Sequence, residues 1–140
     1  MNGDGRPDLI TSNDCAVGPC LGLEPGTIGV LLGNGDGTFQ KAIVTFTLIS
    51  GGHLAVADFN HDGKLDVACG QSDSLLLGNG DGTFQAPLIL GVQGLGIATA
   101  DFNLDGKPDI VSEAATMLLN ISGGAGRPSP PSAAPRRGLR

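Results

Sequence analysis

The sequence predicts an all-β fold, organised as an incomplete β-propeller of about two to three four-stranded blades. Glycine and proline are frequent, at 24 and 9 of 140 residues, which favours short strands joined by tight turns over long helices. Short apolar segments are spread along the chain, and two motifs recur at offsets of 43 and 45 residues. A repeat of this length with about four strands has the size of one propeller blade.

The apolar segments have the length of strands. Each is bounded by residues such as Gly, Asn and Asp, whereas a helix normally needs about ten positions of 3.6-residue periodicity. The segments are 28–32, 44–48, 54–57, 65–69, 75–77, 88–90, 97–100, 109–111 and 117–119.

A glycine-rich motif is predicted to form a turn in each repeat. Residues 31–40 read LLGNGDGTFQ, and the same letters recur at 76–85. Asn-Gly followed by Asp-Gly is typical of tight hairpin turns, because Gly and Asn tolerate positive φ. A faint similarity to the calcium-binding Gly and Asp repeats of β-helices leaves a functional interpretation open. The single carboxylate in each copy favours the turn.

The second repeated motif is an acidic loop. Residues 58–66 read DFNHDGKLD, residues 101–109 read DFNLDGKPD, and residues 2–8 read NGDGRPD, a weaker copy. The weaker copy lacks its first ligand position, so we expect the chain to begin within a motif and to be a fragment of a longer protein.

Such a loop is predicted to bind a cation. Side chains at positions 1, 3 and 5 can converge, glycine at position 6 permits a sharp turn, and a main-chain carbonyl at position 7 and a carboxylate at position 9 can complete the site. Hard oxygen ligands of this kind suit Ca²⁺. The predicted ligands are Asp58, Asn60, Asp62, the carbonyl of Lys64 and Asp66 in one loop, and Asp101, Asn103, Asp105, the carbonyl of Lys107 and Asp109 in the other.

The helical EF-hand is the competing interpretation of this loop. It requires a bidentate Glu at the twelfth position, where this chain has Cys69 and Ser112. The flanking residues 54–57 and 65–68 also have the character of strands rather than of amphipathic helices. The loops are therefore predicted to join strands in hairpins.

The acidic loop followed by the glycine-rich turn resembles the FG-GAP and VCBS repeat family, whose blades are similar to those of the integrin α-subunit propeller. The resemblance covers roughly residues 1–120 and implies calcium binding through positions 1, 3, 5 and 9 and the main-chain oxygen of position 7. Both full loops keep every ligand type. The first loop offers Asn2, Asp4 and Asp8, which would form at best a depleted site, with Met1 where the other loops have Phe.

Other segments depart from the repeat. Residues 11–26 are predicted to be a surface insertion, and Cys15 and Cys20 within it are close enough in sequence to form a small disulfide. The glycine-rich turn is replaced after residue 119, which predicts an incomplete last blade. The domain is expected to span residues 1–122, and the Gly, Pro and Arg-rich tail 123–140 is expected to be disordered.

About two and a half blades cannot close a propeller, which typically has four to eight. Besides the fragment, self-assembly of copies into a ring and an open stack of repeats are the alternatives.

The charge distribution limits the kinds of partner that the chain could bind. Residues 1–122 hold 14 acidic and four basic residues, a net charge of about −10, and eight of the acids lie in the three loops. This makes nucleic acid an unsuitable partner. No apolar run reaches the roughly 20 residues needed to span a bilayer. Cys69 is expected to be a buried strand residue.

The resulting hypothesis is a calcium-stabilised binding or adhesion module of an exported or cell-surface protein, with a protein or glycan as ligand. Catalysis is the second class, because His53 and His61 with nearby carboxylates could act as acid and base. His61, however, is replaced by Leu104 in the next copy, so no enzyme is predicted. Carbohydrate binding is the third class, and the absence of Trp and Tyr weakens it.

Overall fold

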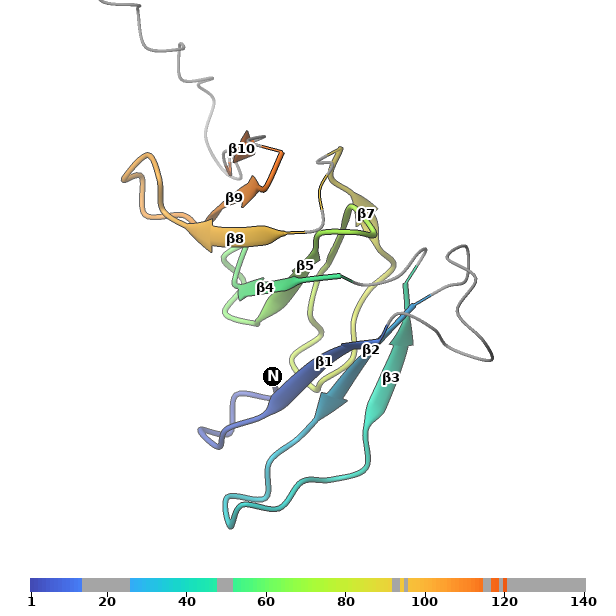
Figure 1. The fold of residues 1–140 in the computed structure, drawn as a ribbon. Helices are drawn as coiled ribbons and strands as arrows, with labels where there is room; N and C mark the ends of the chain where they lie inside the picture. Colours follow the sequence, from blue (N-terminus) through green and yellow to red (C-terminus); the bar gives the residue numbers. More distant parts are fainter. Residues whose placement is uncertain are drawn as a thin grey trace, which may run out of the picture.

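The computed structural model describes residues 1–13, 26–47, 52–91, 94, 96–114, 117–118 and 120. These residues form ten strands and no helix, which confirms the all-β prediction. The strands make three antiparallel sheets, and Figure 1 shows the second sheet lying between the other two. This arrangement of small stacked sheets is consistent with an incomplete propeller.

The sheets have three, four and three strands among the described residues. The first consists of β1 (Leu9–Asn13), β2 (Thr27–Leu31) and β3 (Ile43–Phe46). The second consists of β4 (Leu54–Ala57), β5 (Asp66–Cys69), β6 (Ser74–Leu76) and β7 (Leu88–Ile89). The third consists of β8 (Ile97–Ala100), β9 (Asp109–Ser112) and β10 (Met117–Leu118). Each strand pairs with its neighbours in chain order.

The hydrophobic core is divided between the two junctions of the stack. Ile28, Val30, Val67, Cys69 and Leu76 form a fully buried cluster between the first and second sheets. A second cluster of Ala55, Phe59, Ala68 and Ile110 lies between the second and third sheets. Because side chains alternate along a strand, β5 points Val67 and Cys69 to one neighbour and Ala68 to the other. The burial of Cys69 in a strand was predicted correctly.

One strand was missed. The sequence LITSN of β1 contains only two strongly apolar residues, and residues 11–26 were assigned to an insertion. The structure instead pairs Thr11 with Gly29 and Asn13 with Thr27, so the insertion prediction is wrong for residues 11–13. The available signal was Asp8 at the ninth position of its loop, because the equivalent Asp66 and Asp109 begin β5 and β9.

The four repeated phenylalanines differ in how far they are buried. Phe59 is buried and Phe84 packs against the first cluster, whereas Phe39 and Phe102 are 38% and 47% exposed. The physical reason is their place in the stack. Phe39 lies in the first repeat and Phe102 in the third, where no further described sheet covers them.

Several predictions fall on residues outside the described part of the chain. These are the pairing of Cys15 with Cys20, the disorder of residues 123–140 and the remainder of the insertion. In the part of the chain that the structure does describe, no helix could span a membrane.

Candidate functional site

The loop between β4 and β5 folds around its own side chains. Both carboxylate oxygens of Asp58 accept hydrogen bonds, from the N–H groups of Asp62 at 3.1 Å and Gly63 at 2.9 Å. The amide oxygen of Asn60 accepts from the same Asp62 N–H at 3.0 Å. Asp62 in turn accepts from the N–H of Lys64 at 2.9 Å, a contact that lowers the pKa of the Asp62 carboxyl. The side chains at positions 1, 3 and 5 are thus fixed by the backbone that follows them.

The loop between β8 and β9 repeats this pattern atom for atom. Asp101 accepts from Asp105 and Gly106 at 3.0 and 2.8 Å, and Asn103 accepts from Asp105 at 3.1 Å. Asp105 accepts from Lys107 at 3.0 Å. Two loops of different sequence therefore share one conformation, which is the local structure that the sequence motif encodes.

Two residues of each loop adopt positive φ. Position 6 is Gly63 or Gly106, with φ of 82° and 86°, as the turn requires. Position 4 is His61 or Leu104, with φ of 58° and 59°, although these residues carry a Cβ that is disfavoured there. Sequence reasoning missed this strain. The sequence held one indication of it, because the first loop has a glycine, Gly3, at position 4. In the structure Gly3 also has a positive φ, of 71°.

The carboxylate at position 9 has a role that the sequence did not reveal. Asp66 is fully buried, and its oxygens accept from the N–H of Phe59 at 2.9 Å and from the N–H of Gly78 at 2.8 Å. Burial raises the pKa of the Asp66 carboxyl, and the two N–H donors oppose that rise. Asp66 therefore joins the acidic loop to the glycine-rich turn that follows it.

The same link occurs in the other two repeats. Asp109 accepts from the N–H of Phe102 at 3.0 Å and from that of Asn120 at 2.7 Å. Asp8 accepts from the N–H of Gly33 at 2.9 Å and from the terminal ammonium of Met1. Asn120 thus stands where the earlier repeats have the first glycine of the turn.

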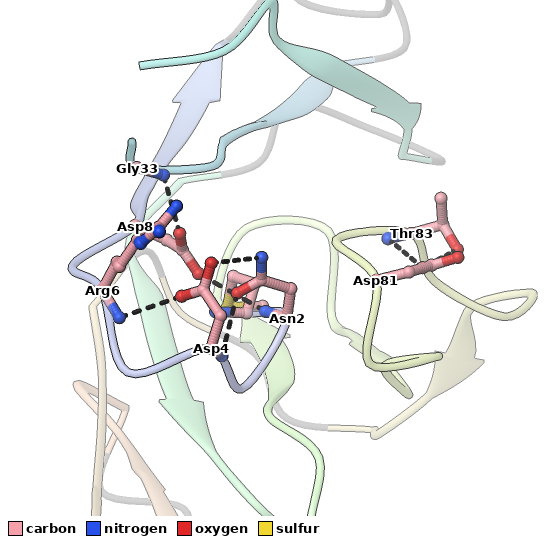
Figure 2. A network of polar contacts seen from close by, with 8 residues as sticks. Asn2, Asp4, Arg6, Asp8, Gly33, Asp81 and Thr83 are labelled. Atoms are coloured by element: carbon pink, nitrogen blue, oxygen red, sulfur yellow. Dashed lines mark hydrogen bonds and ion pairs between the residues drawn. The ribbon is translucent and has the colours of Figure 1, made fainter. Parts of the chain in front are cut away.

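The first loop is built from fewer oxygens. Figure 2 shows Asp4 between Asn2 and Arg6 and Asp8 reaching Gly33. Asp4 accepts from the Arg6 N–H at 2.9 Å and from the Asn2 side chain at 3.0 Å, and the first of these contacts is the main cause of its lowered pKa. Positions 3, 5 and 9 are in place here.

The glycine-rich turns are held by their own polar side chains. Asp81 accepts from the hydroxyl of Thr83 at 2.6 Å and from its N–H at 2.9 Å, and these contacts lower the pKa of Asp81. Asp36 and Thr38 make the same pair in the first sheet. The turn interpretation is therefore supported, because the carboxylate is used to close the hairpin.

The donor set of the two full loops fits a hard cation. Each loop holds two exposed or half-exposed carboxylates and one amide oxygen, which are ligand types preferred by Ca²⁺. Each N–H contact occupies one lone pair of an oxygen that has two, so capacity for a cation remains. Among the described residues no three His, Cys, Asp or Glu side chains gather as metal ligands do. In each full loop the carboxylate at position 9 accepts from the N–H of a more distant residue, Gly78 or Asn120.

Cavities open at both junctions between the described repeats. A cleft of about 410 Å³ lies between the first loop and the second and is lined by Asn2, Arg6 and Lys64 among others. An apolar pocket of about 350 Å³ lies between the second and third sheets, with Phe59, Leu75 and Ile110 in its wall. The equivalent place at the first junction is covered by the turn of the second sheet, since Gly82 packs close to Val30.

The two histidines lie at the surface. His61 is exposed in the strained position of its loop, and His53 is exposed immediately before β4, where its carbonyl accepts from the N–H of Gly70.

Comparison with known proteins gives one match. A family described as FG-GAP-like repeat matches residues 1–69 and again residues 58–112. Neither the curated proteins nor the solved structures contain a match.

Proposed function

Since this chain belongs to the FG-GAP-like repeat family, we propose that it is a calcium-binding β-propeller repeat module in which the cation has a structural role. The observation that carries the proposal is the shared conformation of the two full loops. In both, the oxygens at positions 1, 3 and 5 are oriented by N–H groups of positions 5 to 7. Oriented oxygen ligands lower the entropy cost of coordination.

The electrostatics of the loop favour a cation. Asp58 and Asp62 lie within one short loop, where Asp58 accepts from the backbone N–H of Asp62 itself, so the two negative charges are close and repel each other. The ammonium of Lys64 lies 3.7 Å from a carboxylate oxygen of Asp62, and a partly exposed ion pair of this kind contributes little. A bound divalent ion would supply the missing positive charge at the centre of these oxygens.

The position 9 aspartates connect this binding to the fold. Asp66 holds both the start of the second loop and the turn after β6, and Asp109 does the same in the third repeat. Ordering of the loop by a cation would therefore stabilise the hairpins beside it. The proposed contribution of calcium is to sheet stability, with Asp58, Asn60, Asp62 and the Lys64 carbonyl as primary ligands of the second loop.

We further propose that the module belongs to an exported or surface protein and serves adhesion or ligand binding, not catalysis. Extracellular calcium modules bind with dissociation constants of about 10⁻⁴ to 10⁻³ M, which suits compartments with millimolar calcium. His61 is exposed, and Leu104 occupies the same position in the other full loop. The loop therefore does not require an imidazole at this position.

The test is thermal unfolding with and without calcium. At a calcium concentration of about 100 times the dissociation constant, each site would stabilise the fold by about 2.7 kcal/mol. The double variant Asp62→Ala, Asp105→Ala should lose this calcium-dependent gain. An equal gain in the variant and the wild type would remove these loops as the site.

A matched control uses the aspartates of the turns. Asp36→Ala, Asp81→Ala removes two exposed carboxylates that close hairpins and lie outside the loops. This variant should unfold at a lower temperature in both conditions, while the increment caused by calcium stays unchanged.

A further inference from the structure

The two outer faces of the stack of sheets carry apolar residues. The equivalent residues of the neighbouring repeats are buried at the junctions inside the stack. We name Leu9, Leu31 and Phe39 of the first repeat the front face, and Ala98, Phe102 and Val111 of the third repeat the back face. Leu9 pairs with Leu31 across β1 and β2, and Ala98 pairs with Val111 across β8 and β9, so each pair shares one side of its sheet. Leu9 is 47% exposed and Phe102 is 47% exposed.

The back face has exact counterparts at an internal junction. Residues 98, 102 and 111 follow residues 55, 59 and 68 by the same 43 positions. Ala55, Phe59 and Ala68 are at most 6% exposed because the third sheet covers them. The back face is therefore the surface on which a following sheet would pack.

The residues of the front face also have buried counterparts, in this case at the junction between the first and second sheets. Leu9, Leu31 and Phe39 occupy the places of Val67, Leu76 and Phe84, which contact the first sheet. Val67 and Leu76 have no exposed area. The front face is therefore the surface on which a preceding sheet would pack.

We propose that the back face of one copy of this chain packs on the front face of a second copy, continuing the internal junctions across two molecules. The apolar character agrees with the internal junction. There the second sheet presents Ala55 and Ala68 to Ile110, and here their counterparts, Ala98 and the larger Val111, would face Leu9, the counterpart of Ile110. No proposed calcium ligand belongs to either face, although Phe102 of the back face lies between Asp101 and Asn103 of the third loop.

The symmetry of the contact predicts the size of the assembly. Front and back faces differ, so the contact is heterologous, and such contacts generate rings when the rotation closes. Two copies of three sheets supply six blades, within the range of about four to eight found in closed propellers. The second copy is therefore expected to complete a two-chain ring.

The experiment measures the mass of the full chain by light scattering during size exclusion. It is run at an ionic strength of about 0.15 M or above, because both copies carry the same acidic excess and salt screens their repulsion. The wild type should have twice the monomer mass of 14.0 kDa. A wild type that stays at 14.0 kDa over the accessible concentration range would overturn the proposal.

Single-face variants test the head-to-tail arrangement. Leu9→Lys places a charge on the front face and Ala98→Arg places one on the back face, and each should weaken association roughly 100-fold, because an unpaired charge is desolvated there. An equimolar mixture should recover a two-chain species, since each variant keeps one intact face. A mixture that remains monomeric, or a dimer that Ala98→Arg leaves intact, contradicts the arrangement.

Two further variants serve as checks. Ile89→Lys replaces an apolar residue on β7 that is 63% exposed and lies outside both faces, and its mass should equal that of the wild type. Phe39→Lys is a second front-face variant in a turn, and it should also recover a two-chain species with Ala98→Arg.

Discussion

Replacing Asp66 by Asn should destabilise the second repeat strongly, even without calcium. Asp66 is fully buried and accepts from the N–H groups of Phe59 and Gly78 through its two oxygens. Asn has one oxygen and one NH₂ group, so one of the two buried N–H groups must lose its acceptor. A lost charge-assisted hydrogen bond costs about 1.5 to 3 kcal/mol, and a buried unsatisfied N–H costs about 1 to 3 kcal/mol.

Part of this loss is offset, because burial raises the pKa of Asp66 and the neutral Asn escapes the desolvation of a charge. We therefore expect a net loss of about 2 to 4 kcal/mol in the free energy of unfolding. Urea unfolding with chelator present would measure it, followed by far-ultraviolet circular dichroism because the chain has no Trp or Tyr. For an m-value of about 2 kcal/mol per M, the midpoint should fall by about 1 to 2 M.

Asp58→Asn is the matched control for this measurement. Its hydrogen bonds lie in an exposed part of the loop, where water can replace them, so its cost should stay below about 1 kcal/mol. If Asp66→Asn changes the midpoint no more than Asp58→Asn, the buried link between loop and turn is not a main stabilising contact.

Three further changes test the local geometry. Leu104→Gly should raise stability by about 1 kcal/mol and the melting temperature by several degrees, because glycine relieves the φ of 59°, whereas Leu104→Ala should give no such gain. Gly78→Ala should destabilise by about 2 kcal/mol or more in urea unfolding, since its Cβ would overlap the carbonyl oxygen of Leu65; an unchanged midpoint would disprove that close approach. Thr83→Val removes the hydroxyl that is the main cause of the lowered pKa of Asp81, so the pKa measured by NMR should rise toward 3.8. A carboxyl whose pKa is lowered by folding stabilises the protein above pH 3.8, and this stabilisation is lost as the pH falls. The variant should therefore lose less stability on acidification than the wild type. If neither the pKa of Asp81 nor the pH dependence of stability changes, this contact is excluded.

The repeats made most of the fold predictable. The identical letters at 31–40 and 76–85 fixed both hairpin turns, and the acidic loops at 58–66 and 101–109 were correctly placed between strands. Strand 54–57 and strand 97–100 were predicted with the bounds that the structure has. Local sequence sufficed here because short-range hydrogen bonds determine these loops and turns.

Features that depend on distant neighbours were not predictable in the same way. The exposure of Phe39 and Phe102 follows from their position at the ends of the stack, although their local sequences match those of Phe84 and Phe59. The orientation of Asp66 toward the turn depends on a glycine twelve residues away. A motif names such a residue as a ligand, but it does not show which groups its oxygens meet.

The measurement that tests the central claim most directly is calcium titration by isothermal calorimetry on the full chain. The second and third loops share one preorganised conformation, so we expect about two ions per chain with dissociation constants of about 10⁻⁴ to 10⁻³ M. The double variant Asp62→Ala, Asp105→Ala should show no binding heat in this range. Absence of binding heat from the wild type at millimolar calcium, or binding that persists in the double variant, would contradict the account.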